Sequence, residues 1–211
     1  MQFLLKLSNL IDRANGSIGR WVAWAVLAAV IVSAGNAIAR KFFGSGSNAW
    51  LELQWYLFGA IFLLSSGYTL LKNGHVRVDV LATKLPRRTQ VGIEVFGTLF
   101  FLLPAALLTM VLGWPMFWES WTSQEMSSNS GGLIRWPAKL LVPIGFCLLI
   151  AAALSHLIKC VAFLRGQGPD PLPGAAAMTE EEKLAAELRA RAEAETAAGT
   201  NLADKKKRDR N

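Results

Sequence analysis

The chain has 211 residues, of which 53% are hydrophobic, and it carries a net charge of +7. All of the excess charge lies in residues 1–164, which hold 13 Lys/Arg against 6 Asp/Glu, whereas residues 165–211 hold 9 of each. The basic residues flank apolar runs and line no groove. They therefore indicate topology signals and contacts with anionic membrane lipids, and argue against a nucleic-acid partner. The two cysteines, Cys147 and Cys160, share one apolar run and form no disulfide or metal framework.

Residues 1–20 are too polar to cross a membrane, but their apolar residues recur at helical spacing opposite three basic ones. This pattern predicts an amphipathic helix on the membrane surface. An equally open alternative is a leader helix that packs on its own bundle. The apolar residues are Phe3, Leu4, Leu7, Leu10, Ile11 and Ile18, and the basic ones are Lys6, Arg13 and Arg20.

Residues 21–39 predict the first membrane-spanning helix. Ala37-Ile38-Ala39 resembles a signal-peptide cleavage site, but the apolar run before it is too long, so we expect an uncleaved span. Small residues stand four apart on one face and would let another helix approach closely. Ordinary packing inside the membrane also explains this stripe. It consists of Ala25, Ala29, Ser33 and Ala37.

Residues 51–71 predict the second spanning helix. Residues 55–71 carry no charge, and aromatic residues at their start fit an interfacial belt. Glu52 lies near the outer end, where an acid is either a structural group at the interface or a functional one. Gln54 fits a polar helix face turned towards protein.

The basic residues predict the orientation of the chain. The segment before the first span holds three Lys/Arg and residues 72–88 hold five, against two in each of the other connections. The positive-inside rule then places both termini in the cytoplasm, with four spans.

Residues 91–113 predict the third span, with a kink at Pro104. Trp114, Phe117, Trp118 and Trp121 follow with the spacing of one helix face, and Glu119 falls off that face. We expect a short separate helix there, lying flat on the outer surface.

Residues 138–164 predict the fourth span, and residues 21–165 together make up the membrane domain. Residues 166–211 predict a Pro/Gly linker followed by a charged cytoplasmic tail. A dispensable tail is the simplest interpretation of this segment.

No phosphate-binding loop, nucleophile motif or Cys/His metal spacing is present in the sequence, and we expect no cofactor and no metal. His75 and His156 are both predicted near the cytoplasmic side, and two histidines can ligate a haem between helices. A membrane-anchor b-type cytochrome subunit of a respiratory enzyme is therefore the alternative function. A self-sufficient ion-coupled carrier fits less well, because the middles of the spans hold essentially no charge.

Five short motifs stand at the ends of the predicted spans: Asn48-x-Trp50-x-Glu52, Asn73-Gly-His75-Val-Arg77-Val-Asp79, Leu85-Pro-Arg-Arg88, Glu125-Met-Ser127 and Gly132-Leu-Ile-Arg-Trp136-Pro-Ala-Lys139-Leu-Leu-Val-Pro143-Ile-Gly145-Phe146. Together they resemble the small membrane subunit (DctQ-like) of tripartite ATP-independent periplasmic (TRAP) transporters, over about residues 15–165. One departure is Leu53, where the family often has a second acid beside Glu52.

The resemblance implies a subunit without catalytic residues in the bacterial inner membrane. It implies two partners: a large membrane subunit, which carries the substrate and sodium sites, and a periplasmic binding protein, which delivers an organic acid or similar solute. As interface residues we predict the small-residue stripe with Glu52, Gln54, Arg77 and Asp79. Near the docking periplasmic protein we predict Trp118, Glu119 and Glu125.

Overall fold

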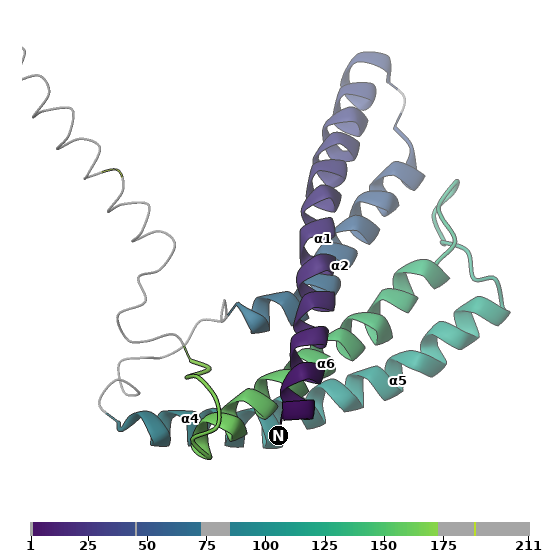
Figure 1. The fold of residues 1–211 in the computed structure, drawn as a ribbon. Helices are drawn as coiled ribbons and strands as arrows, with labels where there is room; N and C mark the ends of the chain where they lie inside the picture. Colours follow the sequence, from purple (N-terminus) through teal and green to yellow (C-terminus); the bar gives the residue numbers. More distant parts are fainter. Residues whose placement is uncertain (1, 45, 73–84, 173–187, 189–211) are drawn as a thin grey trace, which may run out of the picture. The chain divides into compact units, whose positions relative to one another are not determined.

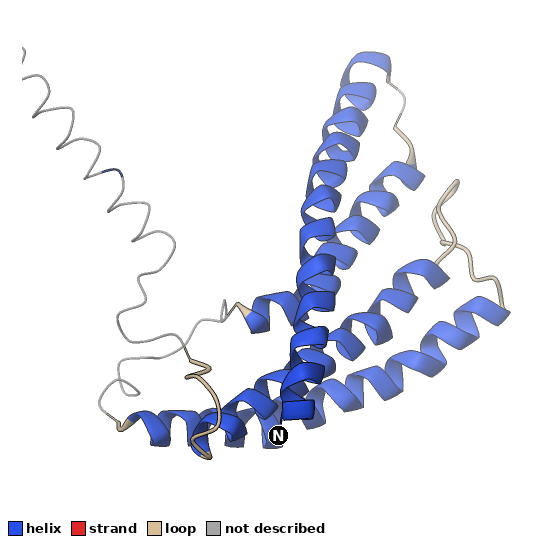
Figure 2. Ribbon diagram, viewed as in Figure 1, coloured by secondary structure: helices blue, strands red, loops and turns tan. Residues whose placement is uncertain are grey.

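The computed structural model describes residues 2–44, 46–72, 85–172 and 188, and these are helical apart from short connections (Figures 1 and 2). The chain divides after Leu172, and the described helices of residues 1–172 belong to one unit. The predicted all-α class is confirmed for the described residues. The elements are α1 (Gln2–Phe43), α2 (Asn48–Leu71), α4 (Arg87–Gly97), the π-helical turn η1 (Thr98–Leu102), α5 (Leu103–Thr122) and α6 (Trp136–Leu164).

Three helical stretches are long and apolar enough to cross a membrane: Phe3–Phe43, Arg87–Thr122 and Trp136–Leu164. Helix α2 is not among them; it carries Glu52 and Gln54 near its start and hydroxyl residues in its second half. These hydroxyls bond back to carbonyls of their own helix. Ser65 donates to Ile61 at 2.6 Å and Thr69 donates to Ser65 at 3.0 Å. The predicted count of four spans therefore stays a prediction.

Helix α1 runs without interruption for 42 residues, so the predicted boundary between a surface helix and a span near residue 20 is absent. The helix stays continuous because its buried positions recur every seven residues on both sides of that point. Such a heptad repeat keeps one face against neighbouring helices over many turns. The buried positions are Ser8, Asn15, Val22, Ala29 and Asn36.

Helix α2 packs between α1 and α6, and glycines let the three backbones approach (Figure 1). A Cβ added at Gly67 would lie 2.9 Å from the carbonyl oxygen of Leu148 and would also meet the side chain of Asn15. One added at Gly145 of α6 would lie 2.8 Å from the carbonyl oxygen of Leu63. These glycines therefore mark the points where α2 crosses its neighbours.

Helices α4 and α5 are joined by η1 and lie against α6. The predicted disturbance at Pro104 takes the form of this π-helical turn, which directly precedes the first turn of α5 where proline needs no N–H partner. The separate surface helix predicted around Trp114–Trp121 is absent. Instead α5 continues to Thr122 with Pro115 inside it, at an exposed position.

Candidate functional site

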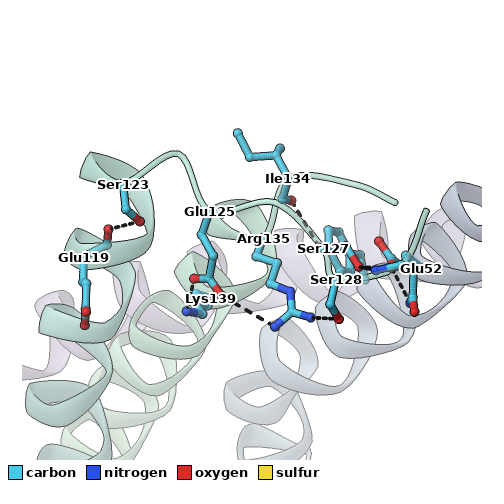
Figure 3. A network of polar contacts seen from close by, with 11 residues as sticks. Glu52, Glu119, Ser123, Glu125, Ser127, Ser128, Ile134, Arg135 and Lys139 are labelled. Atoms are coloured by element: carbon cyan, nitrogen blue, oxygen red, sulfur yellow. Dashed lines mark hydrogen bonds and ion pairs between the residues drawn. The ribbon is translucent and has the colours of Figure 1, made fainter. Parts of the chain in front are cut away.

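A polar clasp forms where the start of α2 meets the connection between α5 and α6 (Figure 3). Glu52 is its centre, and only 6% of this residue is exposed. One carboxylate oxygen accepts hydrogen bonds from the Ser127 hydroxyl and from Asn129 Nδ2, the latter at 2.9 Å. The other oxygen accepts from the backbone N–H of Leu133 at 2.6 Å. We call Glu52, Ser127, Asn129 and Leu133 the Glu52 clasp.

The connection is shaped to present these donors. Ser127 N–H donates to the Leu133 carbonyl at 3.0 Å, which closes a tight loop. Gly131 at the tip has φ +71°, a conformation that glycine adopts without strain. Gly132 is also required, since a Cβ there would lie 2.8 Å from Glu52 Oε1. The loop can therefore approach the Glu52 carboxylate this closely only with glycine at position 132.

Two further bonds join the same connection to α2. The Tyr56 hydroxyl donates to the Ile134 carbonyl at 3.1 Å, and Asn48 Nδ2 donates to the Ser130 carbonyl at 3.0 Å. Together with the Glu52 clasp, these bonds fasten a little more than two turns of α2 to the connection that precedes α6.

A second carboxylate, Glu125, anchors the base of the connection. It pairs with Lys139 of α6, and its other oxygen lies 3.5 Å from Arg135 Nη1 (Figure 3). The hydrogen bond from Lys139 is the main cause that holds the pKa of Glu125 below its ordinary value of 4.5. The charge of Glu125 is consequently balanced by basic residues of the same chain.

Ion pairs gather at the other end of α6. Asp12 of α1 pairs with Lys159 and accepts a hydrogen bond from the Ser155 hydroxyl at 2.5 Å. The hydroxyls of Ser8 and Ser155 lie 2.7 Å apart. We call Ser8, Asp12, Ser155 and Lys159 the Asp12 cluster.

Two more pairs join α4 to α6 and to the segment after it. Glu94 Oε1 lies 3.3 Å from the Nε2 of buried His156. Arg87 Nε donates to Asp170 at 2.5 Å, and its Nη2 donates to the Leu172 carbonyl at 2.6 Å. The chain after α6 is therefore tied to the start of α4.

The predicted interface residues fall into different environments. Ala29 is 1% exposed and is buried by this chain's own helices, whereas Ala37 at the end of the stripe is exposed. Trp118 and Glu119 are exposed on α5. Ala25, Ser33 and Gln54 are half-buried, and Arg77 and Asp79 lie outside the described residues.

The haem alternative gains no support from the described residues. His75 lies outside them, and Nε2 of His156 faces Glu94 and lies 3.5 Å from the Cys160 sulfur. Within the described part of the chain, no group of three or more His, Cys, Asp or Glu residues could hold a metal ion.

Sequence analysis singled out Glu52 as an interface candidate, but it missed the groups of the same chain that bind this carboxylate, and it missed the Asp12 cluster. Ser8 and Asn15 stand on the same heptad face as Ala29, so a period of seven that includes polar residues was the available signal. The backbone N–H of Leu133 left no signal in the sequence.

Residues 29–163, well over half of the chain, match the family model for the DctQ component of tripartite ATP-independent periplasmic transporters. A search of curated proteins finds no match to this chain. The Glu52 clasp, α2 and the whole of α6 up to Phe163 lie inside the matched range. The chain therefore belongs to the DctQ family and is a small membrane component of a TRAP transporter.

Proposed function

We propose that this subunit performs no chemistry and scaffolds the large membrane subunit of a sodium-coupled TRAP transporter, which imports an organic acid or similar small solute delivered by a periplasmic binding protein. The observation that carries this proposal is the uncovered apolar surface of α5. Leu108 and Leu112 are 61% and 65% exposed, and only 11% of the most apolar 18-residue stretch of Arg87–Thr122 is buried. A helix left this bare is suited to pack against another membrane protein and lipid.

The same proposal includes four spans. Helix α2 packs against α6 from the Tyr56–Ile134 hydrogen bond to the contact of Leu70 with Ala152 and Ala153. If α6 crosses the bilayer, a helix packed along that length crosses with it. The Lys/Arg distribution then orients the Glu52 clasp towards the periplasm and the Asp12 cluster towards the cytoplasm, with both termini cytoplasmic.

Docking of the periplasmic protein belongs near the end of α5 in this proposal. Trp118 is 57% exposed there, and the adjacent Glu119 is exposed as well. Glu125 is engaged by Lys139, so Glu119 is the carboxylate of the two that is accessible to a partner. Glu119→Lys is expected to slow uptake at limiting binding protein, and unchanged uptake would remove this docking role.

Co-purification tests the scaffold proposal. The tagged full chain, expressed with its large subunit, is expected to retain that subunit through size-exclusion chromatography. Tryptophan replacements of exposed α5 residues such as Leu108 should reduce the amount of large subunit retained at positions that contact that subunit. At positions that face lipid, the amount retained should be unchanged. A stable monomer that never retains a larger membrane protein, or sodium-driven uptake by this chain alone in vesicles, would refute the proposal.

A further inference from the structure

An apolar groove runs between the first turns of α1 and the last turns of α6, with a volume of about 440 Å³. Its α1 wall consists of Leu4, Leu7 and Ile11. Its α6 wall includes Leu157, Ile158 and Val161. The groove flanks the Asp12 cluster, where Asp12 and Lys159 neutralise one another.

The neighbouring surface shows what surrounds the groove. Phe3, Leu7 and Leu10 are 76%, 41% and 62% exposed on the same turns of α1. Side chains this apolar and this exposed are suited to hydrocarbon and not to water. The groove therefore opens onto the lipid phase in the membrane placement proposed above, on which this inference rests.

The length of the groove fits one lipid chain. Its lining residues on α6 extend from Leu154 to Arg165, and eleven steps of an α-helix cover about 16 Å. One leaflet of hydrocarbon is about 15 Å deep, half of the roughly 30 Å bilayer core. An acyl chain can therefore occupy the groove over its full depth.

The charge at the end of the groove selects the headgroup. Arg165 caps the end of α6, is exposed, and makes no side-chain hydrogen bond or ion pair among the described residues. A guanidinium binds phosphate oxygens in a planar, two-pronged manner. We propose that this groove is a binding site for an anionic phospholipid of the inner leaflet, with one acyl chain between α1 and α6 and its phosphate on Arg165.

Lipid retention tests the site. The full chain, co-purified with its large subunit, is placed in nanodiscs of equal parts phosphatidylglycerol and phosphatidylcholine with identical chains, and retained lipid is counted by native mass spectrometry after release. Retention is expected to favour phosphatidylglycerol by about fivefold, the effect of one basic residue at an anionic surface. Arg165→Gln should abolish the preference, and Ile158→Trp, which fills the groove, should remove the retained lipid.

Two matched controls keep the result specific. Arg88→Gln removes an exposed basic residue of α4 outside the groove, and Ile144→Trp adds the same bulk elsewhere on α6. Both should retain lipid like the unmodified protein. Equal retention of the two lipids, an unaffected Arg165→Gln protein, or the same loss in Arg88→Gln would overturn the proposal.

A photo-crosslinker at position 158 identifies the occupant directly. Lipid adducts support the site, whereas capture of the large subunit or of residues 173–211 would overturn it. The chain is isolated together with its large subunit, so the two proposals are tested separately. If the complex is intact but shows no lipid preference, this inference is refuted and the scaffold proposal is unaffected.

Discussion

The connection that precedes α6 and the last turns of α6 are fastened to other helices by different electrostatic means. At the Glu52 clasp a single buried carboxylate is held by a hydroxyl, an amide and a backbone N–H, none of which is charged. At the Asp12 cluster a carboxylate whose side chain is about a quarter exposed meets an ammonium group. A charge that is satisfied by dipoles depends on the position of every donor, whereas an ion pair depends on charge and is weakened by salt.

The difference indicates different tasks for the two ends. The clasp fixes the shape of a loop, because its donors come from three positions of one short connection. The Asp12 cluster fixes only the distance between two helices. We therefore expect the clasp to be intolerant of conservative change, and the Asp12 cluster to accept exchanged partners.

Gly67 lies where α2 approaches α1 and α6 most closely, so added bulk there should have the largest effect. Gly67→Ala places a methyl group against Asn15 and the Leu148 carbonyl, and overpacking of this kind costs about 1–3 kcal/mol. Gly59→Ala on the same helix meets nothing within 4 Å and should be neutral or stabilising. Apparent unfolding temperatures in detergent compare the two, and equal values would show that the crossing is not tightly packed.

Glu52→Gln should give the next largest effect. The glutamine keeps the shape but turns an N–H₂ group towards one of the clasp donors, which leaves that donor unpaired. We expect an apparent unfolding temperature lowered by roughly 5 °C. Gln54→Ala, which removes a half-buried side chain of the same turn, is the control. If both variants unfold alike, the clasp does not stabilise the fold.

Asp12→Asn should have a smaller effect, because about a quarter of the Asp12 side chain and a third of the Lys159 side chain are exposed. Screening by solvent limits the loss to about 1 kcal/mol. The exchanged pair Asp12→Lys with Lys159→Asp should recover part of it, which the clasp would not permit. The neighbouring Arg13→Gln, at an exposed position, serves as control in denaturant titrations. Failure of the exchange to recover any stability would assign the effect to the Ser155 bond.

The smallest effect is a pH dependence at Glu125. Since Lys139 lowers the folded-state pKa of Glu125 below 4.5, its stabilisation is complete above that value and is lost as the pH falls through the lower folded-state pKa. Unmodified protein and Glu125→Gln should therefore differ in unfolding temperature at pH 7 and converge towards pH 3. Glu119→Gln, on an exposed side chain, should match the unmodified protein at both pH values. A constant difference across this range would contradict the assignment.

The sequence predicted α2 and α6 closely, because each is an apolar run bounded by tryptophan or charge. Predicted residues 51–71 and 138–164 correspond to Asn48–Leu71 and Trp136–Leu164. An apolar run of this length favours a helix, since a helix satisfies its own backbone hydrogen bonds within one segment. The clasp was only partly predictable: a lone Glu52 in an apolar flank signals a buried charge, but its donors lie some 75 residues away in a loop whose shape depends on Gly131 and Gly132.

Helix boundaries were harder to predict, because tertiary packing overrides local sequence there. The pattern of residues 1–20 left open a helix on the membrane surface or a leader packed on its own bundle. In the structure these residues begin one continuous helix, in which Ser8 and Asn15 are buried. Likewise the aromatic spacing around Trp114–Trp121 suggested a separate helix, yet α5 continues through this segment with Pro115 at an exposed position. In both cases the sequence pattern was interpreted from nearby residues alone, whereas contacts with other helices determine where each helix ends.

The π-helical turn at Thr98–Leu102 also sets the rotational phase of everything that follows it. Each α-helical residue advances the side-chain direction by about 100°, so a wide turn that accommodates one extra residue re-aims the whole distal half of the rod. Beyond this turn, the indoles of Trp121 and Trp136 meet edge to face with their ring centroids 4.5 Å apart. Deleting one residue from this turn would rotate the side chains of α5 by about 100° and turn its aromatic side away from α6. One residue in the turn therefore determines which face of α5 meets α6.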